Sequence, residues 1–169
     1  MRKEPDRKRV GLVVLVAASV LALDQWSKSW ITHNPCPEQL LSGFITLVHS
    51  QNRGAAFGLL VNQVFLIIVS ICIIIIIIFL VLRYRDLATS LTLLSLGLIL
   101  GGATGNVVER LRFGYVTDFI DVRLWHDFHW PAFNFADTAI VIGTLTLIYS
   151  LYQLGLFRKV YDHNRTTGE

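Results

Sequence analysis

Two aspartates in the second half of the chain are the residues best suited to carry out chemistry. Asp118 lies in an apolar, strand-like stretch, and Asp137 follows Asn134 at the start of an apolar segment of helical length. Two carboxyls at one site cannot both ionise easily, so they share a proton, and such a pair can activate water against a peptide carbonyl. An alternative stays open for each: Asp137 as an acid that complements a helix dipole, and Asp118 as a turn-forming or solvated acid.

Other polar residues gather near the ends of the apolar segments. Asp24 and Lys28 are four residues apart within the first segment, so they share a helical face and can neutralise each other. Asn134 is suited to cap the fourth segment, which would place Asp137 at the third helical position. Ionisable groups at membrane depth are costly and usually functional, although packing, turn formation or interfacial anchoring would explain each residue alone. The remaining candidates are Asn52, Gly54, Asn106 and Arg110.

The elements that must position these residues are membrane-spanning helices. Of the 169 residues, 53% are hydrophobic and 16% are charged, whereas a soluble domain carries about 25% charged residues. A spanning helix needs about 20 mainly apolar residues. Four segments qualify, and we expect them to form a single membrane-embedded domain of the all-α class: 10–31, 61–82, 87–108 and 136–156.

The distribution of basic residues predicts the orientation of these helices. The first segment follows a basic N-terminus, as in a secretory signal peptide, but it is long enough to span and is interpreted as a retained helix. Lysine and arginine are more numerous in the two terminal tails and the turn after the second helix than in segments 32–60 and 109–135. The positive-inside rule then places both termini in the cytoplasm and these two segments in the periplasm.

The two periplasmic segments and the third helix have further patterns. Residues 43–49 and 113–122 are rich in strand formers, which predicts a small β element resting, with its loop, on the outer membrane face. Gly97, Gly101 and Gly105 recur every four residues in the third helix. In lipid such a ridge lets helix backbones approach closely.

Several other classes of protein are disfavoured. The net charge of +3 comes from residues flanking the membrane, and no nucleic-acid-binding motif is present. A small transporter or channel would need polar residues at several depths, but the second and fourth helices are almost wholly apolar at their centres. A purely structural protein is the third alternative. No metal-ligand spacing matches the polar residues of the last periplasmic loop, which are Asp121, His126, Asp127 and His129.

Five motifs, in order along nearly the whole chain, resemble the bacterial prolipoprotein signal peptidases, the type II signal peptidases. They are DQWSK (24–28), NRGAAF (52–57), GGATGN (101–106), VTDFI (116–120) and FNFAD (133–137). The resemblance implies an aspartyl endopeptidase of the inner membrane. Such an enzyme cleaves a prolipoprotein immediately before its diacylglyceryl-modified cysteine, with its active site at the periplasmic face.

The resemblance also assigns roles to residues. It implies that Asp118 and Asp137 are the catalytic pair, that globomycin inhibits the enzyme, and that no metal or organic cofactor takes part. We expect no partner beyond substrate and membrane lipid, and we expect the chain to be a monomer. Glu109 departs from the pattern, because the family commonly has aspartate there. The residues implied to hold substrate or shape the site are Asp24, Lys28, Asn52, Gly54, Asn106, Arg110 and Asn134.

Overall fold

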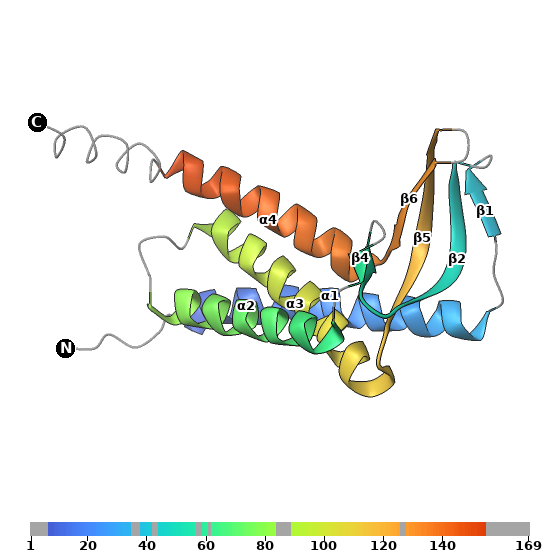
Figure 1. Cartoon of the computed structure of the whole chain (residues 1–169). Helices are drawn as coiled ribbons and strands as arrows, with labels where there is room; N and C mark the ends of the chain where they lie inside the picture. The colour runs from blue at the N-terminus through green and yellow to red at the C-terminus, as the bar shows by residue number, and fades with distance from the viewer. Residues whose placement is uncertain are drawn as a thin grey trace, which may run out of the picture.

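The computed structural model describes residues 7–34, 38–41, 44–56, 59–60, 62–83, 89–125 and 128–154. In chain order through this part of the chain, four strands lie between the first and second helices, and two strands lie between the third and fourth helices (Figure 1). The helices are α1 (Arg7–His33), α2 (Gln63–Arg83), α3 (Ser90–Phe113) and α4 (Phe135–Gln153). The strands are β1 (Glu38–Leu41), β2 (Ile45–Asn52), β3 (Ala55–Ala56), β4 (Leu59–Leu60), β5 (Val116–Trp125) and β6 (Phe128–Phe133).

Among the described residues, four helices are long and apolar enough to cross a membrane. They overlap the four predicted segments, and α2 buries only Ile77 because nearly all of its apolar surface faces outward. The third helix is longer than predicted, since it continues to Phe113. Glu109, Arg110 and Arg112 therefore lie on the last turns of α3, and not in a loop that begins at residue 109.

Helix α3 is the centre of the bundle, because it packs against α1, α2 and α4. Its small residues make this possible. A Cβ at Gly101 would lie 2.6 Å from the carbonyl oxygen of Ala17 on α1, and a Cβ at Gly102 would meet the carbonyl oxygen of Ala136 on α4. The glycine ridge predicted from the sequence thus brings the backbone of α1 against α3, and Gly102 beside it does the same for the first turn of α4.

The end of α3 is set by a glycine cap. Gly114 adopts the left-handed conformation, with φ 74°, and its N–H donates to the carbonyl of Arg110. Glycine reaches this conformation without a steric penalty. The chain then turns and enters β5 at Val116, so the cap places the start of that strand beside the end of α3.

A four-stranded antiparallel sheet covers one end of the helical bundle (Figure 1). Its strand order is β1-β2-β5-β6, so the two strand-like stretches predicted from the sequence become the central strands. Ser50 of β2 lies opposite Asp118 of β5, and Ile120 lies opposite Phe133 of β6. Strand β6 then leads directly into α4, which carries Asp137.

We expect Gly102→Ala to lower the midpoint of thermal unfolding, because the added methyl group would push the first turn of α4 away from α3. Overpacking of this kind typically costs about 1–3 kcal/mol. Gly11→Ala is the matched control, since nothing lies within 4 Å of a Cβ at that position on α1. Equal midpoints for the two variants would contradict the close approach of α3 and α4.

Candidate active site

The first turn of α4 is closed by a reciprocal pair of hydrogen bonds. The side-chain oxygen of Asn134 accepts from the Asp137 N–H at 2.9 Å, and Oδ2 of Asp137 accepts from the Asn134 N–H at 3.3 Å. The predicted cap at Asn134, with Asp137 at the third helical position, is confirmed, and the two residues form a capping box. It places Asp137 at the positive end of the α4 dipole, where a carboxylate is stabilised.

Asn134 also joins the two aspartates. Its Nδ2 donates to Oδ1 of Asp118 at 2.6 Å, while its Oδ1 holds the backbone of Asp137. Two more asparagines complete the arrangement: Asn52 Nδ2 donates to Oδ2 of Asp118 at 2.9 Å, and Asn106 Nδ2 donates to Oδ1 of Asp137 at 2.8 Å. The aspartates of β5 and α4 thus lie in one network, in which neutral amides donate to both carboxyls.

The environment of Asp118 favours its protonated form. Its side chain is buried at 2% exposure, and this burial is the main reason that its pKa rises from 3.8 to about 6. The negative charge of Asp137 raises the pKa further, whereas the hydrogen bonds from Asn52 and Asn134 and the charge of Lys28 lower it. A carboxyl that titrates near neutrality is suited to proton transfer.

Gly54 determines how Asn52 is presented to Asp118. The N–H of Gly54 donates to Oδ1 of Asn52 at 2.8 Å, which leaves the Nδ2 group directed at the carboxyl. Gly54 has a φ of 101° and is buried. Because this φ is strained for any residue with a Cβ, a glycine is required at this turn.

A buried ammonium group lies behind the two aspartates. Lys28 Nζ contacts Oδ2 of Asp24 at 2.9 Å, Oε2 of Glu109 at 3.0 Å and Oδ1 of Asn106 at 3.0 Å. All three ammonium hydrogens therefore have acceptors, although the residue is only 2% exposed. The ion pair of Asp24 and Lys28 predicted from their spacing is confirmed, and Asn106 connects it to Asp137.

Asp24 supports the first turn of α4 directly. Its Oδ1 accepts the Ala136 N–H at 3.0 Å, one of the helix N–H groups that lack a partner within the helix. Gln25 Nε2 donates to its Oδ2 at 3.1 Å. Space for this carboxylate depends on Gly105, where a Cβ would lie 2.6 Å from Oδ2. Asp24 thereby fixes the helix on which Asp137 stands.

Glu109 belongs to this network, although it was not among the predicted site residues. Its Oε2 accepts from the Thr117 N–H at 2.9 Å and its Oε1 accepts from the Thr117 hydroxyl at 2.8 Å. Glu109 therefore links Lys28 to the residue that precedes Asp118. Its place one helical turn after Asn106 was the available signal, but its contact with β5 depends on the fold of the later chain.

Arg110 lies beside the two carboxylates without a direct bond to them. Its guanidinium is partly buried, and its Nε has no hydrogen-bond partner among the described residues. Its positive charge interacts with both Asp137 and Asp118. This group is therefore free to hydrogen-bond a molecule that approaches the pair.

The structure thus gathers the predicted site residues at the junction of α1, α3, α4 and the sheet. Asp121 instead pairs with His129 at 2.7 Å, on the exposed part of the sheet. His126 and Asp127 lie outside the described residues. In the described part of the chain, no group of three or more potential metal-binding side chains is present.

The sequence model of the family Signal peptidase (SPase) II matches residues 16–153 of the chain. The chain belongs to the signal peptidase II family. A lipoprotein signal peptidase of Moorella thermoacetica is 44% identical over 141 residues, covering 82% of this chain and 91% of the relative. The lipoprotein signal peptidase of Syntrophotalea carbinolica is 38% identical over 157 residues, covering 86% and 93%.

The fold is also similar to those of solved bacterial membrane enzymes. A bacterial membrane enzyme solved by the in meso method at 2.3 Å resolution superposes with a TM-score of 0.75 at 28% identity, covering 90% of this chain and 93% of that one. A second, at 1.9 Å resolution, has a TM-score of 0.74 at 29% identity, covering 89% and 97%. The chain is a membrane protein, and signal peptidase II enzymes are aspartyl endopeptidases that remove signal peptides from prolipoproteins.

The raised pKa of Asp118 predicts how stability depends on pH. The folded chain binds the proton more tightly than the unfolded chain does, so this contribution is full below pH 3.8 and is lost as the pH rises through about 6. At 1.36 kcal/mol per pKa unit, the loss is roughly 3 kcal/mol. Thermal midpoints measured across this range should fall less steeply with pH for Asp118→Asn than for the wild type, and parallel curves would contradict the shift.

Glu109→Gln should destabilise the signal peptidase, because it weakens the pairing of the buried Lys28 ammonium and replaces one acceptor of the Thr117 bonds with a donor. We expect a loss of about 1–3 kcal/mol in the free energy of unfolding, measured as a lower thermal midpoint. Glu109→Asp keeps the charge and should lose less. If Glu109→Gln leaves the midpoint unchanged, this link between α3 and β5 does not stabilise the fold.

Proposed function

We propose that Asp118 and Asp137 are the catalytic pair of this signal peptidase and that cleavage occurs immediately before the diacylglyceryl-modified cysteine of a prolipoprotein. The observation that carries the proposal is the bridge made by Asn134, which binds the carboxyl of Asp118 and the backbone of Asp137. This bridge holds two acidic side chains beside each other at the junction of the helices and the sheet. Membership of the family supports the reaction, and this geometry supports the choice of the two aspartates.

The reaction follows from a pair that holds one proton. The ionised aspartate takes a proton from a water molecule, whose oxygen then adds to the scissile carbonyl carbon. The protonated aspartate donates to the carbonyl oxygen, which gives a tetrahedral intermediate. Collapse of this intermediate breaks the C–N bond: the leaving amine receives the proton held by the first aspartate, and the second aspartate takes back a hydroxyl proton as the new carboxyl group forms. The pKa of Asp118, near 6, keeps a proton available within the pair.

The other residues of the network position these two groups. Asn52, Asn106 and Asn134 orient the carboxyls through neutral donors, and Gly54 orients Asn52. Arg110 is suited to bind a backbone carbonyl of the substrate, because its buried Nε has no partner among the described residues. Asp24, paired with Lys28, holds the first turn of α4 in place by accepting a backbone N–H of that turn.

The orientation in the membrane is part of the proposal. We infer that the chain lies in the bacterial inner membrane with both termini in the cytoplasm, and that the sheet and the aspartates face the periplasm, because lysine and arginine concentrate at the opposite helix ends. Exposed aromatic side chains on the sheet suit contact with the outer membrane surface: Trp125, Phe128 and Trp130. The family also implies a single monomeric peptidase domain that globomycin inhibits.

The proposal is tested by cleavage of a purified, diacylglyceryl-modified prolipoprotein, followed as a shift in gel mobility. Asp118→Asn and Asp137→Asn should each lower the rate by at least about a hundredfold, since general acid–base catalysis typically contributes 10²–10⁴-fold. Asp121→Asn is the matched control, because this acid lies on the same strand but pairs with His129. Wild-type cleavage by either catalytic variant would overturn the assignment, provided that its thermal midpoint shows a folded protein.

A further inference from the structure

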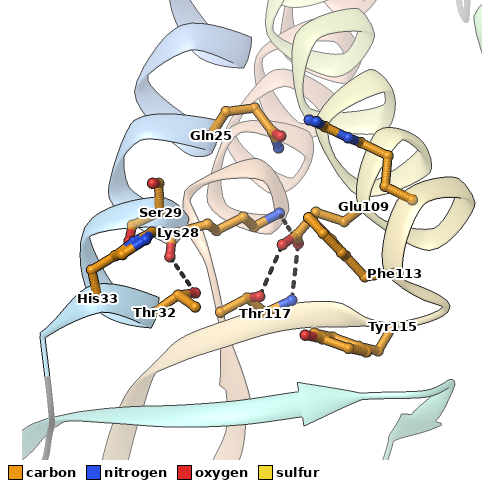
Figure 2. Close-up of a pocket in the computed structure, with 10 residues that line it drawn as sticks. Gln25, Lys28, Ser29, Thr32, His33, Glu109, Phe113, Tyr115 and Thr117 are labelled. Carbon is orange, nitrogen blue, oxygen red and sulfur yellow. Dashed lines mark hydrogen bonds and ion pairs between the residues drawn. The ribbon is translucent and has the colours of Figure 1, made fainter.

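A polar cavity lies on the side of the Lys28–Glu109 ion pair that faces the ends of α1 and α3. It has a volume of about 340 Å³ and is bounded by α1, α3 and the start of β5 (Figure 2). Thr117 faces this cavity while Asp118, the next residue of the strand, bonds to Asn52 and Asn134. Because adjacent strand residues point to opposite faces, the cavity is separate from the catalytic face of β5.

The charged groups at the back of the cavity already have partners. Lys28 is surrounded by three acceptors, and both oxygens of Glu109 accept hydrogen bonds from Thr117. Figure 2 shows this ion pair between α1 and α3, with Tyr115 at the edge of the cavity. These buried groups therefore form a wall of the cavity and are not its free ligands.

The groups at the mouth of the cavity are different. Arg112 is exposed, its guanidinium lies 5.6 Å from the centre of the Phe113 ring, and it forms no ion pair with another described residue. The Tyr115 hydroxyl likewise forms no hydrogen bond within the described part of the chain. His33 donates through Nδ1 to the Ser29 carbonyl at 2.7 Å, so Nε2 of the neutral ring is an acceptor and adds no donor. The mouth therefore presents one cationic donor group, from Arg112, and one neutral donor, from Tyr115.

The position of the cavity indicates where such a ligand would come from. It lies where α1 and α3, both long enough to span a bilayer, come to their ends at His33 and Phe113. Trp26 and Trp30 are exposed on the same part of α1. Tryptophan concentrates at the level of lipid headgroups, so the cavity opens at that level.

We propose that this cavity binds the phosphate of an anionic phospholipid, with Arg112 and Tyr115 as its main donors. A guanidinium and a hydroxyl are suited to phosphate oxygens, and the acyl chains would lie along the exposed apolar surface of α1 and α3. The lipid is favoured over free phosphate because the site opens at the headgroup level. The diacylglyceryl group of a substrate carries no phosphate, so the bound lipid is a resident of the membrane and not the substrate.

Native mass spectrometry of the full chain in detergent, titrated with dioleoylphosphatidylglycerol, tests the proposal. We expect Arg112→Gln to weaken binding of the first lipid about tenfold, the effect of losing one charge-assisted contact, and Tyr115→Phe to weaken it less. Arg123→Gln is the matched control, since it removes the same charge from an exposed position of β5 outside the cavity. Excess inorganic phosphate should leave the lipid bound.

Three outcomes of this titration support or overturn the proposed phospholipid site. Weaker lipid binding by Arg112→Gln, with Arg123→Gln like the wild type and thermal midpoints unchanged, supports the site. Equal lipid binding by Arg112→Gln and the wild type overturns it. Displacement of the lipid by inorganic phosphate alone overturns the lipid as the ligand and assigns the cavity to a soluble anion. Prolipoprotein cleavage in lipid-free detergent should be the same for Arg112→Gln and the wild type, which separates this site from the catalytic pair.

Discussion

The buried ammonium of Lys28 is the interaction on which the rest of the site depends. Removing a charge from water costs several kcal/mol unless its partners are well placed, and here every hydrogen of the ammonium has an acceptor. Asp24 pairs with this ammonium and also accepts a hydrogen bond from the first turn of α4. Glu109 pairs with it and also accepts a hydrogen bond from β5. One cation therefore connects the helices and the strand that carry the two aspartates.

The two sets of carboxyls have different kinds of partner. Asp24 and Glu109 pair with the Lys28 ammonium and accept backbone N–H groups of α4 and β5, so they support the fold. Asp118 instead accepts side-chain hydrogen bonds from the neutral amides of Asn52 and Asn134. Amides orient a carboxyl without neutralising it, so burial dominates and its pKa rises to about 6. The asparagines thus fix geometry while leaving the proton free to move.

Local sequence patterns were sufficient for the parts of this arrangement that depend on near neighbours. The apolar lengths predicted the helices, and the spacing of Asn134 and Asp137 predicted the N-cap and the third helical position, because both depend on residues within a few positions. The link between Asn52 and Asp118 spans 66 residues, and spacing alone could not reveal it; the family resemblance assigned Asn52 to the site without indicating this contact. Strand order and the outer strands of the sheet also depend on such distant pairing.

The extension of α3 shows a different limit. The third span was predicted to end at residue 108, with residues 109–135 as a periplasmic segment. In the structure Glu109 is buried against Lys28, which makes a charged helical turn favourable at that position. Gly114, with its left-handed conformation, was the local signal for the true end of the helix.

Stability and chemistry are coupled in the first turn of α4, because the same side chains serve both. Asn134 is at once the cap of the helix and the bridge to Asp118, and Asp137 is at once the third residue of the capping box and a member of the acidic pair. A helix N-terminus needs acceptors for its free N–H groups, and a catalytic carboxylate needs donors that hold it still. Placing Asp137 in the capping box meets both needs with one side chain. Asp24 then provides the remaining acceptor from behind, at Ala136, so that the helix does not depend on Asp137 alone.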